Sequence, residues 1–430
     1  MKFGGTSVGT AARIKDVARL VSSRPGCPFV VLSAMSGVTN SLAEIAGYLY
    51  NRNPDSARET IKRLEAKHLQ TARELLADDS ADAFIRETFA GISALTREFF
   101  GPVQEKMILA QGELLSTKLM ELFLKKEGVK VALLPALDFM RLDDRGEPDQ
   151  EYIREHLTPL LKADASLFLT QGFICRNLRG EVDNLQRGGS DYTASLIGAA
   201  VGADEIQIWT DIDGMHDNDP RVVEKTSAVR HLHFDEAAEL AYFGAKILHP
   251  TCIQPAKFAN IPVRLLNTME PSAPGTLIDN NPEPGTIKAV AAKDNITAIK
   301  IKSSRMLLAH GFLRKVFEIF ESYRTPIDMI CTSEVGVSLT IDDTRYLNEI
   351  VHDLKKYGTV SVDLDMCIIC VVGDMNWSNC GFETRVMDAL KETPVRMVSY
   401  GGSNYNISIL VREEDKAATL RSLSHNLFGE

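Results

Sequence analysis

Short apolar runs alternate with longer amphipathic segments through the first two thirds of the chain. The runs have the length of strands, and the segments between them have the spacing of helices, as in 55–100, which predicts two or more amphipathic helices. Strands that are separated by long helical segments form parallel sheets. The pattern therefore predicts a mainly parallel sheet with helices on its faces, with strands at Phe29–Ser33, Val129–Pro135, Ser166–Thr170, Glu205–Thr210 and Ile261–Leu266.

The pattern changes at Pro271–Pro284, where Pro, Gly and Asn cluster as in a linker, and then repeats itself. One helical pattern opens at Gly311-Phe312 and a second at Gly381-Phe382, and each is followed by a Thr-Pro pair and two apolar runs. A repeat of about 70 residues indicates two copies of one small α+β module. Coincidence between two similar segments is the alternative.

Composition narrows the class of protein. The net charge of −10 argues against a general binder of nucleic acid or anionic membranes, which usually has a basic face. The seven cysteines are dispersed and lack metal-ligand spacing, which fits a reducing compartment. No apolar stretch reaches the roughly 20 residues that span a bilayer, and the N-terminus lacks a signal-peptide pattern. We expect a cytoplasmic protein with no nucleic-acid or membrane partner.

The first candidate for chemistry is the turn Lys2-Phe3-Gly4-Gly5-Thr6-Ser7. Its glycines let backbone N–H groups approach phosphate oxygens, and Lys2 adds a mobile positive charge just ahead of a helical pattern. Such a turn is also common as a plain connection between a strand and a helix. The chain contains neither G-x-x-x-x-G-K-[ST] nor G-x-G-x-x-G, which weakens the P-loop ATPase and dinucleotide-dehydrogenase interpretations.

Two further turns of small residues, Ser33–Asn40 and Arg187–Thr193, lie beside predicted strands or helix starts. The carboxyl ends of parallel strands share one edge of a sheet, so these turns are expected to converge on one ligand site. The acidic segment Ile208–Arg221 resembles a calcium loop, but its glycine has the wrong offset for an EF-hand. This segment can hold a nucleoside or form a polar surface turn.

Together these segments resemble the aspartokinase family of the amino-acid kinase superfamily. The matching motifs are Lys2–Val8, Ser33–Asn40, Gln111–Glu113, Thr170–Phe173, Arg187–Thr193, Trp209–Asp211 and Phe243–Pro250. The resemblance implies an α/β chain with a three-layer amino-acid kinase fold and a mainly parallel central sheet, followed by two α+β ferredoxin-like ACT domains. We expect the catalytic domain at 1–283 and the tandem ACT domains at 290–430.

The resemblance also implies the reaction and its residues. Such an enzyme transfers the γ-phosphoryl group of ATP to the β-carboxylate of L-aspartate, the first step of lysine, threonine and methionine biosynthesis. It assigns catalysis to Lys2 and Asp191, and aspartate binding to Ser33, Thr39, Glu113, Arg187 and Ser190. It assigns ATP binding to Lys2, Gly4, Gly5, Thr6, Thr210, Asp211, His216, Arg221, Lys246 and Ile247, and His216 stands where the best-known members carry tyrosine.

This reaction needs little general acid–base catalysis. A carboxylate with an ordinary pKa near 4 is already ionised at neutral pH and needs no general base. The difficulty is bringing an anion to ATP, which requires cations and in-line positioning. We expect Mg²⁺ to arrive with ATP, because the sequence shows no separate carboxylate cluster with metal spacing.

The resemblance implies regulation at the ACT domains by L-lysine or another end-product amino acid. Leu308 and Ala309 replace a histidine and a serine of the lysine-inhibited pattern, which removes two polar contacts. ACT domains also imply a homodimer or a higher homo-oligomer. The effector positions that the pattern assigns are Met306, Gly311, Phe312, Leu313, Ile327, Asp328, Ser333, Glu334 and Val335.

There are two alternatives to this function. The first is a kinase of glutamate, acetylglutamate or a nucleotide, against which the Arg187 and Glu113 motifs and the C-terminal repeat argue. The second is an amino-acid sensor whose kinase fold is inactive. The presence of Lys2, Asp191 and Lys246 argues against that sensor.

Overall fold

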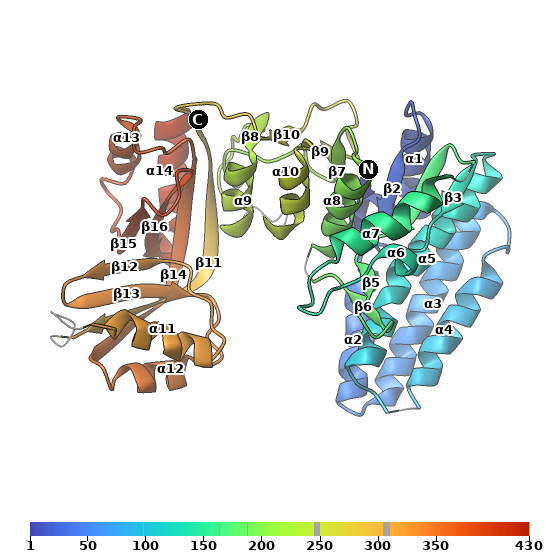
Figure 1. Cartoon of the computed structure of the whole chain (residues 1–430), viewed down its shortest axis with the longest axis horizontal. Helices are drawn as coiled ribbons and strands as arrows, with labels where there is room; N and C mark the ends of the chain where they lie inside the picture. Colours follow the sequence, from blue (N-terminus) through green and yellow to red (C-terminus); the bar gives the residue numbers. More distant parts are fainter. Residues whose placement is uncertain (98, 163, 187, 245–249, 304–309, 430) are drawn as a thin grey trace. The chain divides into compact units, whose positions relative to one another are not determined.

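A computed structural model of the chain describes residues 1–97, 99–162, 164–186, 188–244, 250–303 and 310–429. The chain divides into two compact units (Figure 1). The first comprises Met1–Met215 and Ile247–Asn280, and the second comprises His216–Lys246 and Asn281–Glu430. Among the described residues, no helix has the length and apolarity needed to cross a bilayer.

The first unit is built on a mainly parallel sheet with the strand order β3-β4-β2-β1-β7-β9-β10. Among these strands, only β10 runs antiparallel to its neighbour β9. The five predicted strands are confirmed as β2, β3, β4, β7 and β9. The bounds are β1 (Lys2–Phe3), β2 (Phe29–Leu32), β3 (Val131–Leu133), β4 (Leu167–Gln171), β7 (Ile206–Thr210), β9 (Val263–Asn267) and β10 (Thr276–Asp279).

Strand β10 corrects one prediction, because it lies inside the predicted linker Pro271–Pro284. Thr276 and Ile278 are buried and alternate with the partly buried Leu277 and Asp279, which is the alternation of a strand with one buried face. Four residues flanked by Pro and Gly give too short a pattern to be recognised in the sequence.

Helices cover both faces of this sheet, and a small hairpin joins β5 (Ile174–Arg176) to β6 (Val182–Asn184). The region 55–100 forms two helices, as predicted. The helices are η1 (Gly5–Val8), α1 (Ala11–Ser22), α2 (Val38–Tyr50), α3 (Pro54–Leu76), α4 (Asp82–Leu95), α5 (Pro102–Lys126), α6 (Ala136–Phe139), α7 (Gln150–Leu157), η2 (Thr158–Lys162), α8 (Gly189–Val201), η3 (Pro250–Ile253) and α10 (Gln254–Ala259).

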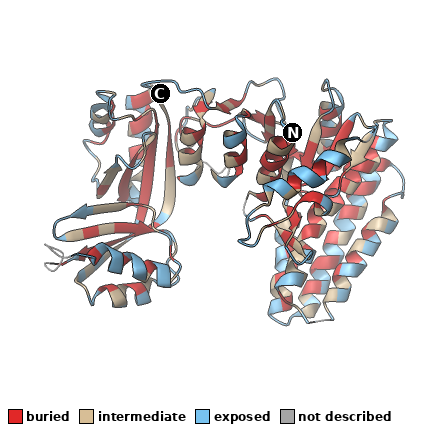
Figure 2. Cartoon of the chain, in the orientation of Figure 1, coloured by how far each residue is buried: buried red, intermediate tan, exposed pale blue. Residues whose placement is uncertain are grey.

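Strand alternation decides which residues face which helices. Phe3 is in register with Leu32 and Trp209, and these three belong to an apolar core that also contains residues of α1 to α5. Figure 2 shows buried residues in red along the strands and helices of the chain. Lys2 is in register with Val31 and Ile208 and therefore points to the opposite face, on which α8 packs. The first strand thus buries an aromatic ring on one side and directs a lysine to the other.

The second unit contains an antiparallel sheet with the order β12-β13-β11-β14-β16-β15. The predicted repeat is confirmed, because helix α11 with strands β12 and β13 matches helix α13 with strands β15 and β16. The bounds are β8 (His231–His233), α9 (Phe234–Tyr242), β11 (Ile287–Lys302), α11 (Phe312–Ser322), β12 (Ile330–Ser333), β13 (Gly336–Ile341), α12 (Leu347–Leu354), β14 (Thr359–Gly373), α13 (Phe382–Ala389), β15 (Met397–Tyr400), β16 (Asn406–Arg412), η4 (Glu413–Asp415) and α14 (Lys416–Phe428).

The two modules of this unit are nested. The second half of β11 pairs with β13 and with the start of β14, which completes the first module. The first half of β11 pairs instead with Met366–Gly373, so that it supplies the edge strand of the second module. The second module is therefore completed by residues that precede the first module in the sequence. The predicted domain start at residue 290 falls inside β11.

Candidate active site

A pocket of about 300 Å³ lies at the carboxyl edge of the parallel sheet in the first unit. It gathers residues from the three turns that the sequence predicts to converge. These turns follow β1 and β2 and precede α8. The pocket is lined by Lys2, Ser33, Thr39, Glu113, Phe173, Gln186, Gly188, Gly189, Ser190 and Asp191.

The structure brings Lys2 and Asp191 into direct contact. The Lys2 Nζ atom lies 2.7 Å from Asp191 Oδ1, and Lys2 is only 8% exposed. Asp191 stands in the first turn of α8, where the positive end of the helix dipole also stabilises a carboxylate. The carboxylate therefore fixes the position of the lysine ammonium group at the pocket wall.

Close packing holds the start of α8 against the end of β4. A Cβ atom on Gly172 would lie 2.6 Å from the Cβ of Ser190, and one on Gly189 would lie 2.7 Å from the ring of Phe173. Phe173 itself has a φ of 68°, which is unusual for an aromatic residue, and its N–H donates to Thr193 Oγ1 at 3.0 Å. Two glycines and one strained backbone position thus allow Ser190 and Asp191 to approach the sheet.

Glu113 is a buried carboxylate in the middle of α5. Its Oε1 accepts a hydrogen bond from the Ala34 N–H at 3.1 Å, and among the described residues its Oε2 has no hydrogen-bond partner. The residue is 3% exposed, and this burial raises the pKa of Glu113 from 4.5 to about 7. A cation that entered the pocket would restore the charged form.

The turn after β2 presents Ser33 and Thr39. Ser116 Oγ on α5 donates to the Ser33 carbonyl at 2.8 Å, and α2 begins after Gly37, whose φ is 77°. A Cβ on Gly112 would lie 2.7 Å from the Cβ of Ala34, so a residue without a side chain lets α5 approach this turn. Helix α5 therefore positions the turn through Gly112 and Ser116 as well as through Glu113.

The turn after β1 forms η1 and contains the predicted phosphate-binding residues. A Cβ on Gly5 would lie 2.8 Å from the Ala34 carbonyl oxygen, which requires glycine there. The Gly4 N–H donates to the Trp209 carbonyl at 3.3 Å, and Arg13 on α1 donates through Nη1 to the Thr6 carbonyl at 2.5 Å. These contacts fix the turn between two neighbouring strands.

Beyond Lys2 and the turn after β1, the predicted nucleotide-binding residues fall into three groups. Thr210 and Asp211 follow β7 in the first unit, where Thr210 Oγ1 donates to Asp211 Oδ1 at 3.1 Å. His216 and Arg221 belong to the second unit, where Asp219 holds the Arg221 guanidinium at 2.9 and 2.7 Å. Lys246 and Ile247 lie outside the described residues, as does Arg187, which was predicted to bind aspartate.

Of the predicted effector residues, Asp328 has the most specific surroundings. Its side chain is 1% exposed, and its Oδ1 accepts from Lys293 Nζ at 2.6 Å and from Tyr242 Oη at 2.8 Å. Gly311 caps α11, Phe312 is buried, and Leu313, Ser333, Glu334 and Val335 are exposed. Ile327 is partly buried, and Met306 lies outside the described residues.

No role was predicted from the sequence for four residues that line the pocket, Phe173, Gln186, Gly188 and Gly189. Gln186 directly precedes the motif Arg187–Thr193, and this position in the sequence indicates that it lies near the site. Nothing in the sequence predicts a positive φ at Phe173, because aromatic residues seldom adopt it.

The sequence is similar to known protein families over most of its length. Residues 1–267 match the Amino acid kinase family, and residues 369–427 match the ACT domain. The chain is 33% identical to the lysine-sensitive aspartokinase 3 of Escherichia coli, over 99% of this chain and 98% of that protein. The chain belongs to the aspartokinase family. The predicted family, fold class and reaction, ATP-dependent phosphorylation of aspartate, are thereby confirmed.

Solved aspartokinase structures show the same fold. The E. coli aspartokinase III complex with aspartate and ADP (R-state) matches with a TM-score of 0.87 and 32% identity, covering 99% of each chain. The complex of that protein with lysine and aspartate (T-state) matches with a TM-score of 0.82 and 33% identity, covering 99% of this chain and 98% of that one. The aspartokinase fold therefore extends over nearly the whole chain.

Proposed function

We propose that the pocket at the carboxyl edge of the sheet binds L-aspartate and that Lys2 stabilises the phosphoryl group during its transfer. The observation that carries this assignment is the pair Lys2 and Asp191 beside the buried carboxylate of Glu113, all lining one pocket. A pocket of about 300 Å³ has room for a small amino acid and not for a whole nucleotide beside it.

The ammonium and carboxylate groups of aspartate each have a proposed binding partner. The ammonium group of aspartate fits Glu113, because a buried carboxylate gains most from a cation when one of its oxygens, as here, has no hydrogen-bond partner among the described residues. Ser33, Thr39 and Ser190 supply hydroxyl groups around the side-chain carboxylate. Arg187 lies outside the described residues, so its pairing with the α-carboxylate of aspartate stays a prediction.

The transfer itself requires electrostatic stabilisation more than proton movement. The aspartate carboxylate attacks in its ionised form, and the Lys2 ammonium group offsets the charge that spreads over the transferring phosphoryl oxygens. Asp191 holds that ammonium group in place before ATP arrives. The N–H groups around Gly4, Gly5 and Thr6 are suited to the phosphates of ATP.

Other parts of the nucleotide site remain predictions of the resemblance. Thr210, Asp211, His216, Arg221, Lys246 and Ile247 are proposed to contact ATP. We keep the expectation that Mg²⁺ accompanies ATP on its phosphates and offsets their charge.

We also propose that an amino-acid effector, L-lysine first, acts at the second unit near Asp328. An aspartokinase of E. coli has been solved with lysine bound, and this chain matches it over nearly its full length. Asp328 Oδ2 is buried without a hydrogen-bond partner among the described residues. A ligand ammonium group would there compete with Lys293 for the carboxylate.

An oligomer through the ACT modules is the corresponding proposal for assembly. Edge strands β12 and β15 lie near one another, and Cys331 Sγ on β12 donates to the Val398 carbonyl on β15 at 3.1 Å. Edge strands carry backbone groups that can pair with a second chain. Sedimentation velocity should show a dimer or a larger homo-oligomer, and a monomer at micromolar concentration would contradict it.

The catalytic assignment is tested by Lys2→Ala. We expect kcat for ADP release with aspartate to fall by about 10²–10³-fold, the usual effect of removing a group that stabilises transition-state charge. The control is Lys62→Ala, which changes an exposed lysine on α3. A Lys2→Ala enzyme with the kcat of the wild type would exclude the assignment.

A further inference from the structure

The segment His216–Lys246 carries kinase-family sequence, yet it packs in the unit that contains the ACT modules. The match to the Amino acid kinase family extends through it to residue 267. In the structure it groups with Asn281–Glu430. The first part of the segment is the 216–223 loop. It includes His216 and Arg221, two residues proposed to bind ATP.

Asn218 is the buried anchor of this loop. The residue is 3% exposed, and its Nδ2 donates to the Leu420 carbonyl of α14 at 3.0 Å. Its Oδ1 accepts from the Asp219 N–H at 2.8 Å. One side chain therefore ties the loop to the C-terminal helix and also shapes the loop between His216 and Arg221.

Backbone and apolar contacts fix both sides of Asn218. The Val290 N–H on β11 donates to the Asp217 carbonyl at 2.7 Å, and Arg421 Nε on α14 donates to the Val222 carbonyl at 3.3 Å. Val223 is buried in the apolar core formed with β14, β16, α13 and α14. The second ACT module thus holds the 216–223 loop at Asp217, Asn218, Val222 and Val223.

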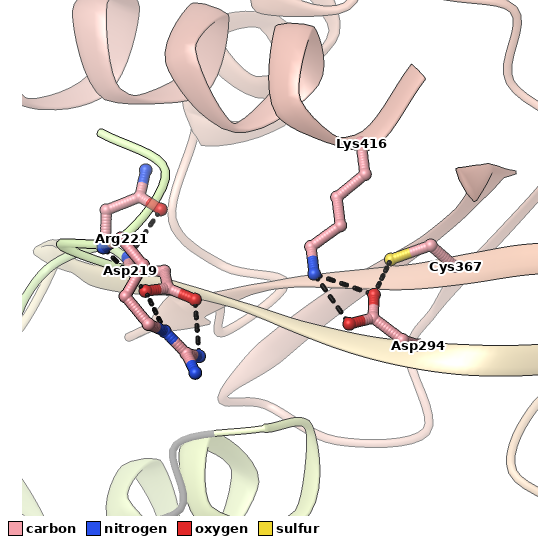
Figure 3. Close-up of polar contacts among 6 residues, drawn as sticks. Asp219, Arg221, Asp294, Cys367 and Lys416 are labelled. Carbon is pink, nitrogen blue, oxygen red and sulfur yellow. Dashed lines mark hydrogen bonds and ion pairs between the residues drawn. The ribbon is translucent and has the colours of Figure 1, made fainter. Parts of the chain in front are cut away.

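Charges surround the same place (Figure 3). Asp219 binds the Arg221 guanidinium, and Lys416 at the start of α14 lies 2.7 Å from both oxygens of Asp294 on β11. Arg221 is the main cause of the lowered pKa of Asp219, with a smaller contribution from Lys416. The guanidinium that is proposed to meet ATP is therefore oriented by an acid that stands beside the ACT module.

We infer that Asn218 is a positioning residue for the nucleotide, through which helix α14 of the second ACT module sets the places of His216 and Arg221. This inference rests on the proposed role of those two residues in binding ATP. A shift of α14 would pass to the 216–223 loop through the Leu420 carbonyl and change the affinity for ATP. The aspartate pocket contains no residue of the loop and would keep its affinity.

The test is a comparison of KM values for ATP and aspartate in the full-length protein. Asn218→Asp keeps the acceptor for the Asp219 N–H and removes the donor to α14. We expect it to raise KM for ATP about fivefold or more, the ratio that corresponds to one net hydrogen bond, and to change KM for aspartate less than twofold. Arg421→Ala should also raise KM for ATP.

The matched control is Asn426→Ala, an exposed asparagine of α14 whose hydrogen bonds stay within its own helix. It should leave both KM values unchanged. Folding of each variant is checked by circular dichroism, and if Asn218→Asp does not fold, Arg421→Ala decides the outcome.

Two results would overturn the inference, and they differ. If His216→Ala and Arg221→Ala both leave KM for ATP unchanged, the proposed nucleotide role fails and the inference fails with it. If either of those variants raises KM for ATP while Asn218→Asp and Arg421→Ala do not, the positioning role alone is wrong. An equal rise in the KM values for ATP and aspartate in Asn218→Asp would also contradict it.

Discussion

Glu113 shows how one buried side chain makes substrate binding depend on pH. Burial raises its pKa from 4.5 to about 7, because the helix α5 backbone and the turn after β2 exclude water from the carboxylate. An ammonium group from the substrate favours the charged form. Below pH 7 the binding of aspartate must therefore be accompanied by loss of a proton from Glu113.

We predict that KM for aspartate rises about tenfold between pH 8 and pH 6, since each unit below the raised pKa reduces the charged fraction about tenfold. Glu113→Gln should bind aspartate weakly and remove this pH dependence. Measuring KM for aspartate across that range checks both statements. A flat profile in the wild type would contradict the proposed pairing.

The same shift has a consequence for stability. The folded state holds the proton of Glu113 more tightly than the unfolded state, so the free energy of unfolding falls as pH rises from about 4.5 to about 7. Glu113→Gln removes this contribution. Its effect on the melting temperature should be more favourable at pH 7.5 than at pH 5, and the opposite order would show that the carboxylate is stabilised when charged.

At this scale the sequence named several residues that the structure brings together at the candidate site. Lys2, Ser33, Thr39 and Glu113 were assigned from family motifs, and the structure gathers them in one pocket. The pairing of Asp328 with Lys293 was not predictable, because two residues 35 positions apart meet only after β11 has formed. Contacts of this kind depend on tertiary packing, which a motif does not describe.

At the scale of elements, the packing of helix α5 on the turn after β2 includes one very close approach. A Cβ on Gly112 would lie 2.7 Å from the Cβ of Ala34. We predict that Gly112→Ala lowers the free energy of unfolding by about 1–3 kcal/mol and raises KM for aspartate, because the turn with Ser33 and Thr39 must shift.

The matched control for this prediction is Gly47→Ala in the interior of α2, where an added Cβ meets nothing within 4 Å. It should be neutral or stabilise the protein by up to about 1 kcal/mol, the difference in helix propensity between the two residues. Thermal or urea unfolding of both variants gives the comparison. Equal effects would show that close packing at Gly112 is not the reason for its glycine.

Local patterns also explain which elements were predicted. Long apolar runs whose residues are all buried, such as β4, can be recognised as strands in the sequence. Strand β10 did not, because four residues between Pro and Gly carry little pattern. The nested pairing of β11 was hidden for another reason, since the repeat shows two modules and says nothing about which strand completes each of them.

At the scale of the whole molecule, regulation is assigned to the second unit. We predict that lysine at millimolar concentration binds and inhibits the enzyme, and that Asp328→Asn weakens lysine binding by about tenfold or more, since it removes a buried carboxylate from the ammonium group. Asp342→Asn is the control, because Asp342 also pairs with Lys293 at 2.9 Å but is more exposed. Isothermal titration without heat from lysine, threonine or methionine would end this proposal.

The assignment of the pocket in the first unit is tested most directly by the choice of acceptor. ADP release should be measured with L-aspartate, with L-glutamate and without an acceptor, for the wild type and for Lys2→Ala. The account predicts fast release with aspartate alone and its loss in Lys2→Ala. Equal rates with glutamate, or an unaffected Lys2→Ala enzyme, would contradict it.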